Sequence, residues 1–162
     1  MSVKLLGIVL ILCAAVTLRS LMLERRLLRH LLCEELYRFL IHVKTRISCY
    51  LDPPSRLHLN FESDALSRCG FLKMLSDGEG VAESLRKSNA SQILSREELN
   101  SVNEALSCVG IGYLDEQIGL LDEKSKAFFA VLEKERESYS RDVKLINTLT
   151  ASLSLGIVIL LL

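Results

Sequence analysis

The chain has 162 residues, enough for one domain of ordinary size with short anchoring segments. Lys and Arg together number 20, as do Asp and Glu, so bulk charge does not favour a nucleic-acid-binding protein. Trp is absent, and proline occurs only at Pro53 and Pro54, so the composition favours helices over sheet and argues against an all-β protein.

The first apolar segment runs without a charge from Leu5 to Leu18. Fourteen helical residues rise only about 21 Å, less than the roughly 30 Å hydrocarbon core of a bilayer. Extension to Leu23 reaches about 28 Å, with Arg19 snorkelling toward a headgroup. We interpret residues 1–23 as an N-terminal transmembrane helix. The alternative is a cleaved signal peptide with a thin basic region at Lys4.

Residues 24–51 form a predicted long helix that continues from the first segment. Its apolar residues recur every three or four positions, as expected for a helix with one buried face. They are Leu28, Leu32, Leu36, Phe39, Val43, Ile47 and Tyr50. The Pro53–Pro54 pair ends this helix, because proline disfavours the helical conformation in the residue before it.

Residues 55–109 are predicted to form shorter helices, three of which close one side of the domain. A glycine-containing turn over 76–80 precedes a short helix over 81–87. Ser95 and Glu98 have the spacing of a capping box, so a helix is expected to begin there and continue to Val109.

A second long helix is predicted from Leu114 to the final apolar segment. Its polar face carries three oppositely charged pairs at i,i+3 or i,i+4, namely Glu123/Lys126, Glu133/Arg136 and Glu137/Arg141. The segment 145–162 contains no charge, and eighteen helical residues span about 27 Å. The sequence therefore predicts a C-terminal transmembrane helix over 145–162 and a helical bundle over 24–144.

Basic residues predict the orientation of both spans. Four arginines follow the first span: Arg19, Arg25, Arg26 and Arg29. Four basic residues precede the second: Lys134, Arg136, Arg141 and Lys144. Because basic residues remain on the cytoplasmic side, both spans place the middle domain in the cytoplasm. The predicted fold is all-α, an antiparallel helical bundle with N- and C-terminal transmembrane helices. The protein is therefore expected to contact membrane lipid.

Motifs that carry catalysis, cofactors or metals are not evident. The five cysteines lie at least sixteen positions apart, so no zinc spacing occurs, and buried reduced thiols are expected. His30 and Glu34 share a helix face, but two ligands do not make a metal site. A Cys–His dyad such as Cys49 with His42 is compatible with helical spacing, but a separation of seven residues is long and no third group joins them. We predict a non-enzyme without cofactor or metal that does not bind nucleic acid.

Several short motifs, in order over nearly the whole chain, resemble one family. They include the opening Lys4-Leu5-Leu6-Gly7, the Ile47–Tyr50 segment followed by Pro53, and the turn from Asp77-Gly78 to Leu85. They also include Gly110 with Gln117 seven residues later, and the closing apolar run around Gly156. This arrangement is similar to the stage III sporulation protein AB family of endospore-forming bacteria. Gly112 and Tyr113 depart from it, since the family usually has Ser-Asp there.

The resemblance implies a role that composition does not provide. Proteins of this family sit in the mother-cell membrane facing the forespore, in a secretion-like channel complex with an ATPase. Their helical domain resembles that of type II secretion platform proteins. On this basis we expect a platform or adaptor for the complex ATPase, with homo-oligomer formation a further option. The alternatives are a platform protein of a type II secretion or pilus-like system, and a membrane-tethered helical adaptor unrelated to sporulation.

Overall fold

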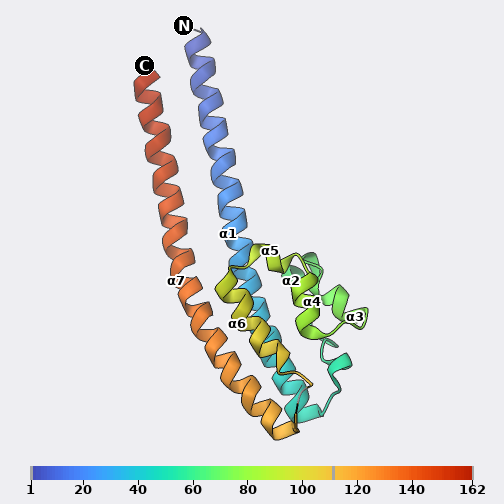
Figure 1. Ribbon diagram of the computed structural model, residues 1–162. Helices are drawn as coiled ribbons and strands as arrows, with labels where there is room; N and C mark the ends of the chain where they lie inside the picture. The colour runs from blue at the N-terminus through green and yellow to red at the C-terminus, as the bar shows by residue number, and fades with distance from the viewer. Residues whose placement is uncertain (1, 111, 162) are drawn as a thin grey trace. The chain divides into compact units, whose positions relative to one another are not determined.

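The computed structural model describes residues 2–110 and 112–161, apart from the side chains of 2–6, 55, 158, 160 and 161. The described chain is all-α, because every regular element in it is a helix (Figure 1). These elements are α1 (Ser2–Tyr50), η1 (Pro54–Arg56), α2 (Asp64–Arg68), α3 (Phe71–Ser76), α4 (Val81–Lys87), α5 (Ala90–Ile93), α6 (Arg96–Ser107) and α7 (Leu114–Leu161). Residues 28–135 form one compact unit, the helical unit, and residues 1–27 with 136–162 form the other, the terminal unit.

The two long helices begin and end close to where the sequence places them. Helix α1 ends at Tyr50, directly before the proline turn, and α7 begins at Leu114. Leu51 follows α1 in the left-handed conformation, at φ 54°, where glycine is the usual residue. The Asp52 N–H donates to the Arg46 carbonyl oxygen at 3.3 Å, which satisfies one of the last carbonyls of α1.

The core of the helical unit is built on the predicted apolar face of α1. Leu32, Leu36, Phe39 and Val43 are fully buried there. Leu121, Phe128 and Leu132 of α7 join them, and the shorter helices contribute the rest. Tyr50 is the exception to the predicted stripe, since its side chain is 65% exposed. The helix ends at this residue, so Tyr50 has left the packed face.

An aromatic cluster links α1 to the segments that follow it. The Phe39 ring contacts those of Phe61 and Phe71 edge-on, with both centroid distances at 5.2 Å. Edge-to-face contacts are favoured because the positive ring edge meets the negative ring face. Phe61 lies in an irregular segment and Phe71 begins α3, so one α1 residue fixes two separate parts of the chain.

The short helices confirm some local predictions and correct others. Helix α4 has the predicted bounds, and Ser95 and Glu98 form both hydrogen bonds of the predicted capping box. Five short α-helices, not three, lie between the long ones in the described chain. Helix α5 was missed because it has only four residues and no side-chain cap. On α7, the sequence predicted Glu123 as the partner of Lys126. In the structure Lys126 Nζ instead lies 2.7 Å from the Asp122 carboxylate.

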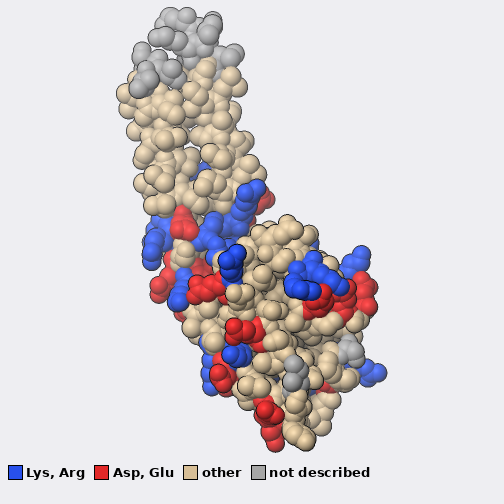
Figure 2. Space-filling model, in the orientation of Figure 1, with Lys and Arg blue, Asp and Glu red and all other residues tan. Residues whose placement is uncertain are grey.

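The terminal unit exposes its apolar side chains. From Gly7 onward, α1 contains an 18-residue window that is long and apolar enough to cross a membrane, and none of that window is buried. Leu145, Leu149, Leu153, Leu155 and Ile159 of α7 are exposed as well. Figure 2 shows an uncharged surface over most of this unit, with charged side chains gathered toward one end. Residues 1 and 162 of the predicted spans lie outside the described residues.

Candidate functional site

The four arginines predicted to orient the protein in a membrane differ in their partners. Arg19 Nε donates to Asn147 Oδ1 at 2.8 Å, and Arg26 contacts Asp142 at 2.5 Å and Ser138 at 3.1 Å. Both contacts lie within the terminal unit and join its two helical segments. Arg25 is exposed and has no partner among the described residues. The membrane-orienting role predicted for the four arginines stays a prediction.

Arg29 belongs to a network inside the helical unit. Its guanidinium makes three hydrogen bonds of 2.8–3.1 Å with the Glu98 carboxylate at the start of α6. The same carboxylate accepts the Ser95 backbone N–H at 2.7 Å as part of the capping box. Burial acts to raise the pKa of Glu98, but the Arg29 and Ser95 donors outweigh it and lower that pKa below its ordinary value. Arg29 thus anchors α6 to α1.

A second polar contact joins α1 to α7 close to the first. His30 Nδ1 lies 3.2 Å from Glu135 Oε2, and its Nε2 lies 3.9 Å from Glu34. His30 and Glu34 thus share a helix face, as their i,i+4 spacing indicates, and the buried Glu135 lies on the other side of the His30 ring. Cys33 is fully buried nearby, and burial raises the pKa of its thiol. Of these groups, His30 and Glu135 join α1 to α7.

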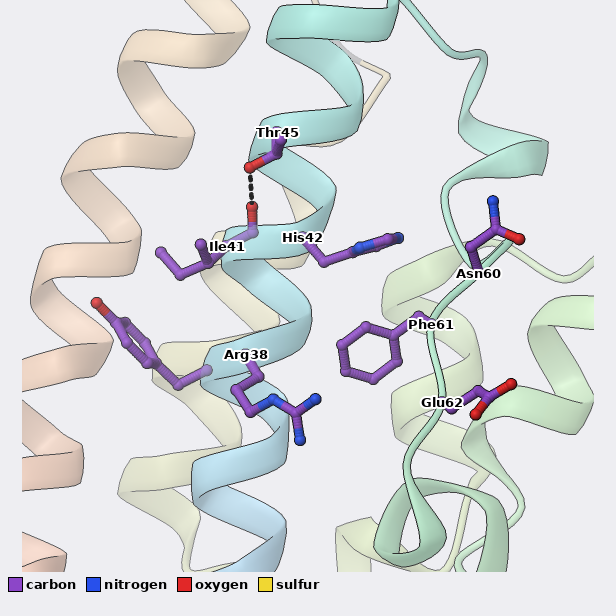
Figure 3. Close-up of a pocket in the computed structure, with 8 residues that line it drawn as sticks. Arg38, Ile41, His42, Thr45, Asn60, Phe61 and Glu62 are labelled. Carbon is purple, nitrogen blue, oxygen red and sulfur yellow. Dashed lines mark hydrogen bonds between the residues drawn. The ribbon is translucent and has the colours of Figure 1, made fainter.

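A groove of about 580 Å³ lies in the helical unit between α1 and the segment 60–62 (Figure 3). Its lining comprises Tyr37, Arg38, Ile41, His42, Thr45, Asn60, Phe61 and Glu62. The His42 ring packs on Phe61 with centroids 5.2 Å apart, and Arg38 lies over the same ring. An apolar floor with charged rims suits binding. The Thr45 hydroxyl, one helical turn from His42, donates to the Ile41 carbonyl oxygen at 2.9 Å.

The pair considered for a thiol hydrolase does not form a contact in the described chain. Burial against Phe61 lowers the pKa of His42. The Cys49 thiol is exposed and lies 3.6 Å from Ser48 Oγ, one residue away. Each group therefore has other neighbours, and the prediction of a non-enzyme stays a prediction.

Four of the six residues selected by family resemblance gather at one end of the helical unit. Tyr50 ends α1 and Pro53 follows it, while Gly110 precedes α7 and Gln117 lies in its first turn. Gly110 has φ 84°, and a Cβ atom on it would lie 3.2 Å from Pro54 Cγ, so glycine is required there. Gly7 and Gly156, in the terminal unit, have open space around them. Their motif role stays a prediction.

The described residues form a groove beside His42 and polar contacts that join α1 to α6 and α7. No cluster of three or more histidine, cysteine, aspartate or glutamate side chains in the described chain is arranged to hold a metal ion. Comparison of the chain with protein families, curated proteins and solved structures finds no match.

Proposed function

We propose that this protein is a non-enzymatic membrane scaffold, with a helical unit that other proteins bind at the cytoplasmic face. One observation carries the proposal: the apolar window of α1 has none of its residues buried. Exposing apolar surface to water costs roughly 25 cal/mol per Å², so a non-aqueous surrounding would stabilise a bare apolar helix of this length. A bilayer provides it.

The end of α7 is proposed as the second span, antiparallel to the first. Its apolar side chains are exposed like those of α1, and Arg19 and Arg26 bond to Asn147 and Asp142 across the terminal unit. A hydrogen bond between helices is favourable in a bilayer, where water does not compete for the same groups. Arg25, exposed at the charged end, would then contact anionic headgroups on the cytoplasmic side.

The anchor and its orientation are tested with a cysteine that the chain already has. With Cys13 and Cys108 replaced by alanine, Cys49 is the exposed thiol, while Cys33 and Cys69 are buried. We expect the full-length protein to remain in membranes after an alkaline wash. Cys49 should resist a membrane-impermeant maleimide in intact cells and react after lysis, because the bilayer separates it from the reagent.

A variant that also carries Cys49→Ala provides the control and should remain unlabelled after lysis. Labelling in intact cells would place the helical unit on the outer face and overturn the orientation. Release of the protein by the alkaline wash would contradict the proposed membrane anchor. A shortened mature chain would identify the first segment as a signal peptide.

The finer proposal is a platform for the ATPase of the channel between mother cell and forespore. It rests on the resemblance to the stage III sporulation protein AB family, with the protein in the mother-cell membrane. A clean deletion of the gene is expected to block late forespore development, and normal spores would contradict this. Crosslinking from the charged face of residues 115–141 to a pilus or secretion ATPase instead would favour the type II secretion alternative, and crosslinking to neither would favour an unrelated adaptor.

A further inference from the structure

A small pocket opens where the end of α1 meets the start of α7 in the helical unit. Ile47, Leu51, Pro54 and Leu114 provide its apolar lining, with Asp52 and Gln117 as polar members. Its volume of about 220 Å³ is below the roughly 300–1,000 Å³ of small-molecule sites. The pocket therefore has room for a side chain of another protein, and a cofactor is too large for it.

The residues around this pocket are unusually exposed for their type. Leu51 is 67% exposed, and Tyr50, which precedes it in the chain, is 65% exposed. Tyr113, which precedes Leu114 of the pocket lining, is 86% exposed. Leu51 also adopts a left-handed backbone conformation that glycine would adopt without strain. Single exposed apolar residues are ordinary, but a contiguous group beside a pocket is typical of an interaction surface.

The Gln117 side chain lines the pocket and has an unused hydrogen-bonding group. It is only 8% exposed, and no hydrogen bond joins its amide to a described residue. One side-chain amide provides both a donor and an acceptor, which matches a peptide group of an incoming chain.

Charge at the rim narrows the choice of partner. Asp115 and Glu116 are exposed in the first turn of α7, and the Glu116 carboxylate lies against Gly112 of the pocket wall. Both carboxylates favour the helix N-terminus, and they also make the rim acidic. Asp52 is paired with Arg46 at 2.6 Å, and Arg56 is exposed in η1. The exposed carboxylates of Asp115 and Glu116 outnumber the single exposed guanidinium of Arg56, so the rim has a net negative charge.

We propose that this pocket, the tip pocket, binds an aliphatic side chain from a lysine- or arginine-rich segment of a partner protein. The Gln117 amide would pair with the backbone of that segment, and Asp115 and Glu116 with its basic residues. A second copy would present the same acidic rim and be repelled, as would an anionic lipid. The inference rests on the proposed scaffold function and specifies the chemistry of its partner.

The test uses the full-length protein in nanodiscs of zwitterionic lipid. The chain has no Trp, so Tyr113→Trp provides a single fluorescent reporter at the rim. The probes are three short synthetic peptides that alternate Lys with Leu, Lys with Ser, and Glu with Leu. We expect only the Lys/Leu peptide to change the emission. Leu51→Gly and Gln117→Leu should each weaken the affinity for the Lys/Leu peptide roughly tenfold, which is the scale of one lost hydrogen bond or apolar contact.

Charge is tested with Asp115→Asn combined with Glu116→Gln, which should weaken binding and flatten its salt dependence. Leu120→Ser is the matched control, because Leu120 is an exposed apolar residue of α7 outside the pocket lining, and it should change nothing. Equal binding of the Glu/Leu peptide, no response to any peptide, or unchanged affinity in the pocket variants would overturn the proposal. Emission that depends on protein concentration alone would identify a second copy as the occupant.

These outcomes are independent of the membrane test. A protein that resists the alkaline wash but ignores the peptides would contradict the tip pocket alone. A protein that binds the Lys/Leu peptide but leaves the membrane would contradict the anchor alone.

Discussion

Replacing Arg29 with methionine is expected to lower the free energy of unfolding of the helical unit by about 3 kcal/mol. The Glu98 carboxylate, whose side chain is 3% exposed, would lose three hydrogen bonds and its only guanidinium partner among the described residues. The estimate takes the low end of the range for a broken buried pair, because Arg29 itself is 30% exposed. Pulse proteolysis in urea of the full-length protein in neutral detergent measures the loss.

Two variants separate this effect from a general loss of charge. Arg25→Met removes an exposed arginine with no described partner and should change the stability by less than about 0.5 kcal/mol. Arg29→Lys keeps the charge but loses the two-pronged geometry, so an intermediate loss is expected. If Arg29→Met and Arg25→Met behaved alike, the anchoring role of Arg29 would be wrong.

The same network predicts a pH dependence. The pKa of Glu98 is lowered in the folded protein, so the stability that Glu98 contributes is present above its ordinary value of 4.5. That contribution is lost as the pH falls below this value, because the unfolded chain then takes up a proton first. The deficit of Arg29→Met should therefore shrink on acidification, since its unpaired carboxyl becomes neutral at higher pH than in the wild type.

Sequence reasoning located the helices whose signals are local. The capping box at Ser95, the proline turn after Tyr50 and the long apolar stripe of α1 each lie within a few residues, so spacing alone reveals them. Helix α5 has neither a side-chain cap nor enough length for a periodic pattern. It is held by tertiary packing, with Ala90 fully buried, and such packing is not visible in the sequence.

The partners of charged residues were the part that sequence could not supply. Arg29 stands beside Arg25 and Arg26 in the chain, so its position suggested a membrane-facing basic cluster. Its partner Glu98 lies 69 residues away, and no local pattern connects them. Gln117 was selected by resemblance as a structural residue, whereas its burial beside a pocket emerged only once α1 and α7 were brought together.

Replacing Phe39 with alanine is expected to cost about 3–5 kcal/mol of stability. The ring is fully buried and holds Phe61 and Phe71 edge-on, each at 5.2 Å, so its loss leaves a cavity against α1. Ordinary domains are stable by only about 5–15 kcal/mol, so the variant should sit near the threshold of unfolding. The same proteolysis measurement, with Phe39→Leu as a smaller truncation, gives the size of the effect.

Phe129→Ala provides the matched control, because it removes the same side chain from a partly exposed site. Phe129 is 38% exposed and contacts Tyr37 with centroids 5.2 Å apart, so a loss nearer 1 kcal/mol is expected. Similar losses at the two sites would mean that the Phe39 cluster is not the centre of the core. A large difference would instead identify α1 as the element that holds the segments 57–76 in place, and thereby shapes the groove beside His42.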